Sequence, residues 1–527
     1  MGNSWLSVTL VLSVSGLALS ARMLALMTTP GKSHHILQYS VMQALAKRGH
    51  QIVVYGHFLP NSPVENITYH VLNSSFIERT DDWSFQDFKD FCQMSSFFGF
   101  AISSLSEVTT LTSEETFRSE NIQNLLNSNE KFDVVFVEAL ISMESMLVFG
   151  HKFKAPVVNF QGIGDWITVD WMAGNSLSVA HIPDRISFDF TNQMSFMERV
   201  RNTVSTTVTL LYYHLFHLPK HQEIIEKYYK DPTMPHITEL VGNIALSLTN
   251  AYQTLEYPRP YTPNIVPIGG AHISTHTAPL PQDIKSFMDD AKNGVIFFSL
   301  GTIVPIQIFP REYIQAFLNV FKKLPVKVLW KTNLQSLLDV PQNVKLTKWV
   351  PQPSVLAHPN CRLFITHGGL MSQHEVLHAG VPVVAIPFFA DQIFNVRFYE
   401  HLGVGRILDF WTMDEDSIYK AVTTVLNDQR YQENAKKMSR IVRDQPMSRM
   451  DSAVYWIEYV LRHRDTRHLR PASAKLPWYQ LWLLDVAAAV LTFLCLSFLI
   501  LYKVTNWVLS RCFNRRHSKL FSDKNKK

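Results

Sequence analysis

The chain alternates short runs rich in β-branched and aromatic residues with amphipathic stretches, and this alternation restricts the fold more than any other feature. The β-branched runs predict strands, and apolar residues at helical spacing between them predict helices. Repeated strand and helix units of this kind build a mostly parallel sheet covered by helices, an α/β fold. Strands are predicted in segments 22–29, 51–57, 133–139, 155–160, 294–301, 326–332, 344–350, 361–369, 381–387 and 403–409.

A proline-rich stretch that includes EYPRPYTPNIVPIGG divides this pattern into two parts. Proline lacks an amide hydrogen and fixes φ, so the stretch is not expected to form a helix or a central strand. A chain of 527 residues is also too long for one hydrophobic core. We therefore predict an N-terminal domain (21–251), a linker (252–293) and a C-terminal domain (294–470), with a ligand site in the cleft between two sheets.

Both ends of the chain are apolar. Residues 1–20 end in small side chains after an apolar run and predict a signal peptide. Residues 481–502 are almost unbroken apolar sequence, long enough for one transmembrane helix, and the basic segment 503–527 predicts a cytosolic tail. This is the pattern of a single-pass type I membrane protein. Asn66 and Asn73 begin glycosylation sequons on the side opposite the cytosol.

Charge and cysteine content exclude two classes of protein. The net charge of +5 is small for this length, and because the excess Lys and Arg lie near the C-terminus, no nucleic-acid surface is predicted. Of the four cysteines, Cys495 lies in the predicted span and Cys512 in the tail, which leaves only Cys92 and Cys361. A disulfide-based scaffold is therefore excluded.

The segment FITHGGLMSQHEVLH, residues 364–378, is compatible with two chemistries. His374, Glu375 and His378 match H-E-x-x-H, in which two histidines one helical turn apart bind zinc and the glutamate acts as base. Gly380 and Pro382 end the predicted helix almost directly after this motif. A zinc metalloprotease is one alternative.

The same segment also has the form of an anion site. A predicted strand runs into His367-Gly368-Gly369, and a helix follows whose free N–H groups point at that turn. Glu375 lies roughly 12 Å along the helix axis from His367, at about 1.5 Å per residue. This separation suits a nucleoside diphosphate, with its phosphates at the helix start and its ribose hydroxyls at the carboxylate.

A longer set of residues resembles the donor-binding motif of the UDP-glycosyltransferases, and the resemblance covers nearly the whole chain. The matching residues are Trp349, Gln352, Leu356, His358, Phe364, His367, Gly369, Ser372, Glu375, Gly380, Pro382, Pro387, Asp391 and Gln392. The membrane-bound animal members, the UDP-glucuronosyltransferases and especially the arthropod UDP-glucosyltransferases, are the most similar. The resemblance implies the GT-B fold, in which two Rossmann-like, doubly wound domains face each other across a cleft, with acceptor bound by the first domain and UDP-sugar by the second.

The resemblance also implies a role for each donor-site residue. Trp349 is expected against uracil, and Gln352 on the nucleoside. His367, Gly369 and Ser372 are expected on the diphosphate, with Ser299 and Thr302 nearby. Glu375 is expected on the ribose, and Asp391 and Gln392 on the sugar. The chain departs from the family at Met371, where mammalian members often have Asn. A polar contact is therefore lost or replaced there.

The catalytic base implied by the resemblance is His34, which precedes His50 of Arg-Gly-His by the interval found in the family. His34 is preferred to His35 for this reason. The nearby helix N-terminus is expected to favour the neutral imidazole that a base requires. The family usually orients this histidine with an Asp; here Glu138 stands at the matching place, and Glu144 is the other candidate.

The implied reaction is an inverting transfer of a hexose from a UDP-sugar to a hydroxyl of a small lipophilic acceptor, as in detoxification. Glucose is favoured as the sugar and glucuronate is possible. No metal and no cofactor beyond the UDP-sugar are expected. The expected location is the endoplasmic reticulum membrane with the catalytic part in the lumen, and a homo-oligomer is possible. An inactive or binding-only relative, explained by Glu138, is the second alternative.

Overall fold

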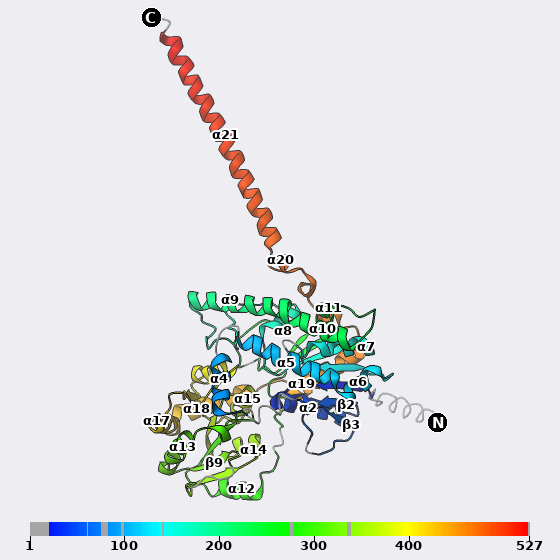
Figure 1. The fold of residues 1–527 in the computed structure, drawn as a ribbon. Coiled ribbons are helices and arrows are strands. Elements are labelled where there is room, and N and C mark those ends of the chain that lie inside the picture. Colours follow the sequence, from blue (N-terminus) through cyan, green and yellow to red (C-terminus); the bar gives the residue numbers. More distant parts are fainter. Residues whose placement is uncertain are drawn as a thin grey trace, which may run out of the picture. The chain divides into compact units, whose positions relative to one another are not determined.

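The computed structural model describes residues 20–60, 62–74, 83–95, 100–139, 142–253, 255–274, 278–302, 304–334 and 339–524. The predicted signal peptide lies outside these residues except for Ser20. The chain forms two compact units, one that ends at Pro471 and one that begins at Ala472. The first unit, called the body below, contains two parallel β-sheets (Figure 1).

The first sheet has seven strands in the order β3-β2-β1-β4-β5-β6-β7. Its strands are β1 (Arg22–Met27), β2 (Gln51–Gly56), β3 (Ile67–Val71), β4 (Val134–Val137), β5 (Val157–Gln161), β6 (Leu246–Thr249) and β7 (Ile265–Pro267). The second sheet has six strands in the order β10-β9-β8-β11-β12-β13. Its strands are β8 (Val295–Ser299), β9 (Lys327–Lys331), β10 (Val344–Thr347), β11 (Cys361–Thr366), β12 (Val383–Ala385) and β13 (Gly405–Ile407). The predicted α/β class and all ten predicted strands are confirmed.

Three strands were not predicted. β3 is only half-buried, β6 has four residues, and β7 has three residues within the proline-rich stretch. β7 lies at the edge of the sheet, where proline is tolerated because no ladder partner needs its missing N–H.

Helices cover both faces of each sheet. They are α2 (Lys32–Lys47), α4 (Phe85–Ser95), α5 (Phe100–Arg118), α6 (Glu120–Asn127), α7 (Val148–Phe153), α8 (Ile167–Ala173), α9 (Phe196–Tyr212), α10 (Leu218–Tyr228), α11 (Ile237–Gly242), α12 (Gln282–Asp289), α13 (Arg311–Lys323), α14 (Gln352–Leu356), α15 (Leu370–Ala379), α16 (Gln392–His401), α17 (Glu415–Asn427), α18 (Gln429–Arg443) and α19 (Arg449–His463). Short turns are η1 (Glu144–Leu147), η3 (Ile306–Ile308), η4 (Arg467–Leu469), η5 (Ala472–Lys475) and the π-helical η2 (Tyr213–His217).

Alternating side chains of each strand enter two different hydrophobic clusters, because successive residues of a strand point to opposite faces. In β1, Leu24 and Leu26 pack with helices α5 to α8, α10 and α11, whereas Met23, Ala25 and Met27 pack with α2 and α19. The second sheet likewise packs on α13 and α17 on one face and on α12, α15, α16 and α18 on the other.

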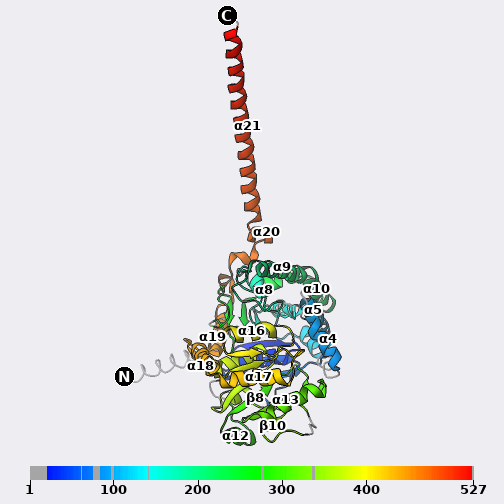
Figure 2. The same ribbon diagram turned by 90° about the vertical axis from the view of Figure 1, so that its left-hand side faces the viewer.

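Two helices pack on the sheet that is not nearest to them in sequence. α4 follows β3 of the first sheet, yet its Phe88 and Cys92 are buried in the cluster of the second sheet. α19 follows the helices of the second sheet, yet its Ala453, Val454 and Ile457 are buried against the first. Residues 449–463, which the sequence assigns to the C-terminal domain, therefore pack on the N-terminal one. Figure 2 shows α4 and α19 from a second direction.

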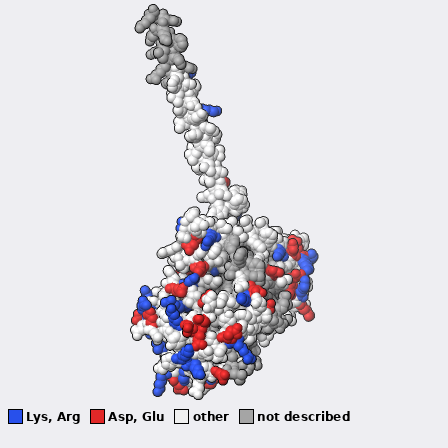
Figure 3. Space-filling view, turned by 60° about the vertical axis from the view of Figure 1, so that its left-hand side comes forward, with Lys and Arg blue, Asp and Glu red and all other residues white. Residues whose placement is uncertain are grey.

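The second compact unit contains α20 (Trp478–Leu481) and α21 (Leu484–Lys524). Within the described chain, α21 holds the one stretch long and apolar enough to cross a membrane, Leu484–Arg511, with a mean hydropathy of 2.5. It overlaps the predicted span, 481–502, and is a candidate membrane span. On the face that Figure 3 draws, Lys and Arg are intermixed with Asp and Glu over the body, whereas the part of α21 that is not grey shows few charges.

Replacing Ile457 tests the packing of α19 on the first sheet. The side chain is fully buried, so Ile457→Ala is expected to lower the free energy of unfolding by about 2 to 5 kcal/mol. Urea denaturation followed by circular dichroism measures this loss. Ile441→Ala, at a position 39% exposed on α18, is the matched control and is expected to have little effect. Equal effects of the two substitutions would contradict the packing of α19.

Candidate functional site

His34 and Glu138 meet at the carboxyl edge of the first sheet. β1 and β4 are parallel neighbours, so the segments that follow them leave the sheet side by side. His34 lies in the first turn of α2, and Glu138 directly follows β4. The His34 Nδ1 atom lies 2.6 Å from Glu138 Oε1, and only 3% of the Glu138 side chain is exposed. The sequence predicted this pairing, and the structure places the two side chains in direct contact.

The buried carboxylate of Glu138 has two further donors. The Gln38 side-chain amide donates to Oε2 at 2.6 Å, and the backbone N–H of Gly162 donates to Oε1 at 2.9 Å. A Cβ at position 162 would lie 2.3 Å from His34 Nδ1 and 2.8 Å from Glu138 Oε1, so only glycine fits there. Gly162 therefore allows the backbone to approach the pair.

Each member of the pair favours the charged form of the other. Burial lowers the pKa of His34, but the charge and hydrogen bond of Glu138 and the charge of Asp391 together raise it above its ordinary value. Burial raises the pKa of Glu138. The charge and hydrogen bond of His34, together with the hydrogen bond from the Gly162 N–H, lower this pKa by more, so it lies below its ordinary value. The pKa of His34 therefore shifts towards the charged form, opposite to the shift expected from the helix N-terminus, because the nearby carboxylates outweigh burial.

The Nδ1 atom of His34 faces the carboxylate and therefore carries the proton that it donates. The Nε2 atom makes no hydrogen bond to any residue that the structure describes, and 20% of the side chain remains exposed. His35 points elsewhere: it is buried against Tyr39, Phe58 and Tyr69. Of the two histidines, only His34 can present a lone pair to a ligand while held by Glu138.

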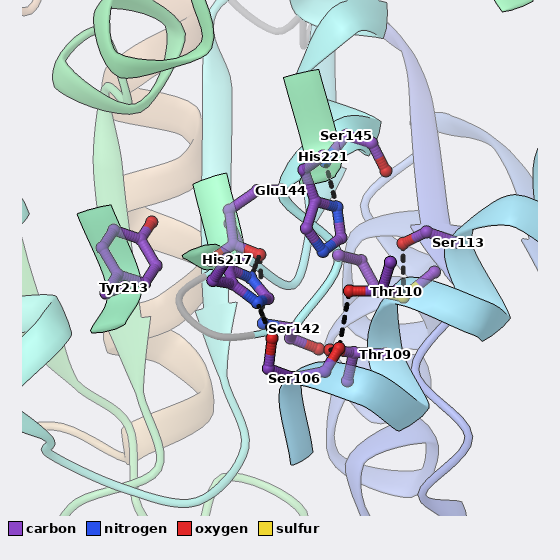
Figure 4. A network of polar contacts seen from close by, with 12 residues as sticks. Ser106, Thr109, Thr110, Ser113, Ser142, Glu144, Ser145, Tyr213, His217 and His221 are labelled. Carbon is purple, nitrogen blue, oxygen red and sulfur yellow. Dashed lines mark hydrogen bonds and ion pairs between the residues drawn. The ribbon is translucent and has the colours of Figure 1, made fainter. Parts of the chain in front are cut away.

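Glu144, the alternative partner, belongs to a separate buried network (Figure 4). Its carboxylate lies 2.7 Å from His217 Nε2, and His217 Nδ1 lies 2.7 Å from the Ser106 hydroxyl. The backbone N–H of Ser142 also donates to Glu144, at 3.1 Å. Glu144 therefore orients the loop after Glu138 and is not the partner of His34.

The Glu144 network also has the composition of a metal site. In the described chain, the ligand atoms of Glu144, His217 and His221 all lie within 4.8 Å of one another. However, the backbone N–H of Ser145 donates to His221 Nδ1 at 3.2 Å, and burial lowers the pKa of His221 to about 3. The neutral ring then carries its proton on Nε2, and among the described residues this buried atom has no hydrogen-bond partner. Hydrogen bonds therefore account for Glu144 and His217 but not for His221 Nε2.

The second half of the site is the N-terminus of α15. Its N-cap residue is Gly369, which has no side chain to cap the first N–H groups of the helix. The His367 ring lies between two glycines: a Cβ at Gly301 or at Gly369 would come within 2.6 Å of it. Burial, with the charge of Lys331, lowers the pKa of His367 to about 4. A neutral imidazole and unpaired helix N–H groups together form a site suited to an anion.

Hydrogen bonds join three of the predicted donor-site residues. The Gln352 amide donates to the Ser372 hydroxyl at 3.0 Å and to Glu375 Oε2 at 2.6 Å. His272 Nε2 lies 3.1 Å from Glu375 Oε1. The contact of His272 with Glu375 was not predicted. His272 follows the proline-rich stretch, three residues after Gly269, and no sequence pattern there indicates a distant partner.

This arrangement argues against the zinc interpretation of H-E-x-x-H. His374 is buried edge-on against the ring of Tyr252, with 4.6 Å between ring centroids. Glu375 is held by Gln352 and His272 instead of facing a histidine of the motif. Among the described residues, His374, Glu375 and His378 form no group of converging ligand atoms.

The other predicted donor-site residues surround the same turn. Ser299 is buried at the end of β8 and accepts the N–H of Gly301, whereas Thr302 is exposed. Trp349 is 62% exposed, so a face of its indole is free to stack on a planar ring. Asp391 accepts from Asn395 at 2.7 Å. Gln392 is buried, and its side-chain oxygen accepts the backbone N–H groups of Phe388 and Phe389.

The two halves of the site face each other. A Cβ at Gly164 would lie 3.1 Å from the side chain of Leu370, the first residue of α15. Met371 packs against the hydrophobic cluster of the first sheet. An apolar contact therefore replaces the polar contact of the Asn that mammalian members often have at this position. The charge of Asp391 also acts on His34. The imidazole and the helix N-terminus therefore border one space.

Comparison with known proteins agrees with this geometry. The family model described as UDP-glucoronosyl and UDP-glucosyl transferase matches residues 24–519. The chain is 33% identical to UDP-glycosyltransferase UGT5 of Dactylopius coccus, over 93% of this chain and 92% of that one. It is 29% identical to human UDP-glucuronosyltransferase 2B15, over 98% of both chains.

Solved structures show the same fold. The calicheamicin glycosyltransferase CalG4 superposes with a TM-score of 0.55 at 18% identity, covering 85% of this chain and all of that one. The forosaminyltransferase SpnP superposes with a TM-score of 0.56 at 14% identity, covering 84% of this chain. The architecture is therefore GT-B. From its sequence, fold and site, the chain belongs to the UDP-glucuronosyl and UDP-glucosyl transferase family and is a hexosyltransferase.

Proposed function

We propose that the protein transfers a hexose from a UDP-sugar to a hydroxyl of a small lipophilic acceptor, with inversion at the anomeric carbon and with His34 as the general base. The observation that carries this proposal is the contact between His34 Nδ1 and Glu138, which leaves Nε2 free. Glucose is the favoured sugar, since UDP-glucosyltransferase 2 of Dactylopius coccus is 33% identical to this chain. Glucuronate is the second candidate.

The reaction is a single displacement. Nε2 of His34 takes the proton of the acceptor hydroxyl, the acceptor oxygen forms a bond to the anomeric carbon, and the bond from that carbon to the UDP oxygen breaks. Glu138 stabilises the imidazolium that forms, as a carboxylate does in a catalytic triad. The charge that develops on UDP is met by the N–H groups at the start of α15 and by one N–H of neutral His367.

The remaining assignments follow the same geometry. Trp349 stacks on uracil, and Gln352 and Glu375 take the nucleoside and its ribose hydroxyls, since each carboxylate oxygen can accept more than one hydrogen bond. Asp391, near His34, takes a sugar hydroxyl. We further propose that the predicted signal peptide and α21 place the body in the lumen of the endoplasmic reticulum, with the exposed Asn66 and Asn73 open to glycosylation.

Substitution of His34 tests the proposal directly. The full chain is assayed with UDP-glucose and UDP-glucuronate against a panel of phenols. His34→Ala is expected to lower kcat on the order of 10² to 10⁴-fold, the contribution of a general base, with UDP affinity unchanged. His181→Ala, at an exposed position, is the control. Loss of UDP binding in His34→Ala, or wild-type turnover, would contradict the assignment.

Substitution of Glu138 tests its role as partner. A base acts only when neutral, so kcat/KM of the wild type is expected to fall as pH drops through the raised pKa of His34. Glu138→Gln removes the negative charge that raises this pKa. The acid limb of the pH profile should therefore move to lower pH, while maximal kcat decreases. Glu138→Asp keeps the charge and should retain the wild-type position of the limb. An unmoved limb in Glu138→Gln would exclude the pairing.

Substitution of Glu375 separates the nucleotide and zinc interpretations. Glu375→Gln is expected to raise KM for the UDP-sugar about tenfold to a hundredfold, because a charged hydrogen bond to the ribose is weakened. The exposed Glu433→Gln on α18 serves as control. Titration of UDP followed by calorimetry checks the loss of affinity, and a chelator is expected to leave transfer unchanged. Unaltered UDP affinity would exclude Glu375 from the donor site.

A further inference from the structure

His272 lies in a tight turn that follows β7, the last strand of the first sheet. The backbone N–H of Gly269 donates to the Ala251 carbonyl at 2.8 Å, and the N–H of Ile273 donates to the Gly270 carbonyl at 2.9 Å. A Cβ at Gly269 would lie 2.5 Å from the Ala251 carbonyl, and Gly270 has a φ of +79°, so both positions require glycine. The backbone that carries His272 is therefore fixed to the segment that follows β6 of the first sheet.

The His272 side chain reaches from this turn to α15 beside the second sheet. Its Nε2 atom lies 3.1 Å from Glu375 Oε1, and only 3% of the His272 side chain and 9% of the Glu375 side chain are exposed. The buried Nδ1 atom has no hydrogen-bond partner in the described part of the chain. Burying a polar nitrogen without a partner costs free energy that an apolar side chain would not cost. The bond to Glu375 is therefore the contact that accounts for an imidazole at this position.

Glu375 is held from both sides. The Gln352 amide donates to Oε2 at 2.6 Å, whereas His272 contacts Oε1. Two contacts on different oxygens fix the plane of the carboxylate. Because each carboxylate oxygen can accept about two hydrogen bonds, each oxygen keeps one acceptor site. These two sites suit the two neighbouring hydroxyls of a ribose, the group that a carboxylate at a nucleotide site accepts.

A second contact from the same turn fixes the neighbouring residue of α15. Tyr252 directly follows Ala251 and packs edge-on against His374, with 4.6 Å between ring centroids. A Cβ at Gly270 would overlap the Tyr252 hydroxyl, so the glycine also leaves room for this ring. Residues 374 and 375 are thus both held by side chains that the first sheet positions.

We propose that His272 is a positioning residue of the donor site. Its hydrogen bond, together with that of Gln352, orients the Glu375 carboxylate so that one lone pair of each oxygen faces one ribose hydroxyl. The donor site thereby selects a ribonucleoside diphosphate, and the turn after β7 sets the geometry of that selection. This inference rests on the proposed contact between Glu375 and the ribose.

Calorimetric titration of the full chain with two nucleotides tests the proposal. UDP has both ribose hydroxyls, and 2′,3′-dideoxyuridine diphosphate has neither. His272→Ala is expected to lower the affinity for UDP about tenfold and to leave the affinity for the dideoxy nucleotide unchanged. In the transfer assay, KM for the UDP-sugar should rise by the same factor while kcat changes little, because His272 does not touch the reacting atoms.

Three further variants serve as controls. His272→Gln keeps an N–H donor near the position of Nε2 and should retain the wild-type affinity for UDP. His221→Ala removes another buried histidine, outside the donor site, and should change neither affinity. The double variant His272→Ala with Glu375→Gln should bind UDP as Glu375→Gln alone does, because His272 acts through that carboxylate.

Equal loss of affinity for both nucleotides in His272→Ala would show a purely structural role and would overturn the proposal. Wild-type affinity for UDP in His272→Ala would also overturn it when Glu375→Gln binds UDP more weakly than the wild type. If Glu375→Gln itself keeps the wild-type affinity, the contact between Glu375 and the ribose is wrong, and the inference fails with it. The Glu375 variant thus separates failure of the donor-site assignment from failure of the role of His272.

Discussion

The buried carboxylate of Glu138 is the interaction on which the first half of the site depends. Burying an ionised carboxylate costs several kcal/mol unless charge and hydrogen bonds compensate it. Here three donors from two segments converge on it: the His34 imidazole and the Gln38 amide from α2, and the Gly162 backbone from the loop after β5. Satisfying this one group therefore fixes the relative positions of the segments that follow β1, β4 and β5. The orientation of the imidazole results from that constraint.

The second half of the site depends on small residues instead of charge. Gly301 and Gly369 leave room for the His367 ring, and Gly164 leaves room for Leu370 of the facing half. Because Asp391 also acts on the pKa of His34, the proton affinity of this histidine depends on a residue of the other half. The chemistry of each half is therefore completed only when the two are together.

Much of this architecture can be predicted from the sequence, because a strand buried on both faces is a continuous β-branched run. VVFV and VVNFQ are examples, and both form central strands. The interval from His34 to His50 likewise selects His34 by resemblance, and of His34 and His35 only His34 contacts Glu138. The sequence favoured Glu138 as its partner but left Glu144 open, since both follow the same strand and only the fold separates their environments.

Other features depend on contacts between residues far apart in sequence. His272 reaches Glu375 across 103 positions, and no local pattern indicates such a pair. The amphipathic pattern of α4 and α19 shows that each has an apolar side but not which sheet that side covers. The buried side of α9 is polar, with Asn202, Ser205, Thr206 and Thr209. This is opposite to what hydrophobic periodicity predicts, because periodicity alone assumes that the apolar side is buried.

The placement of α4 and α19 limits how the chain can be divided into fragments that fold. The chain passes between the two halves before and after α4, again in the proline-rich stretch, and once more before α19. A fragment cut in the proline-rich stretch would leave Phe88 of α4 without Phe309, Phe388 and Phe389. The remaining fragment would expose Ile457 of α19. Neither fragment would fold on its own. Truncations placed only by the order of the domains in the sequence would therefore yield products that are prone to aggregation.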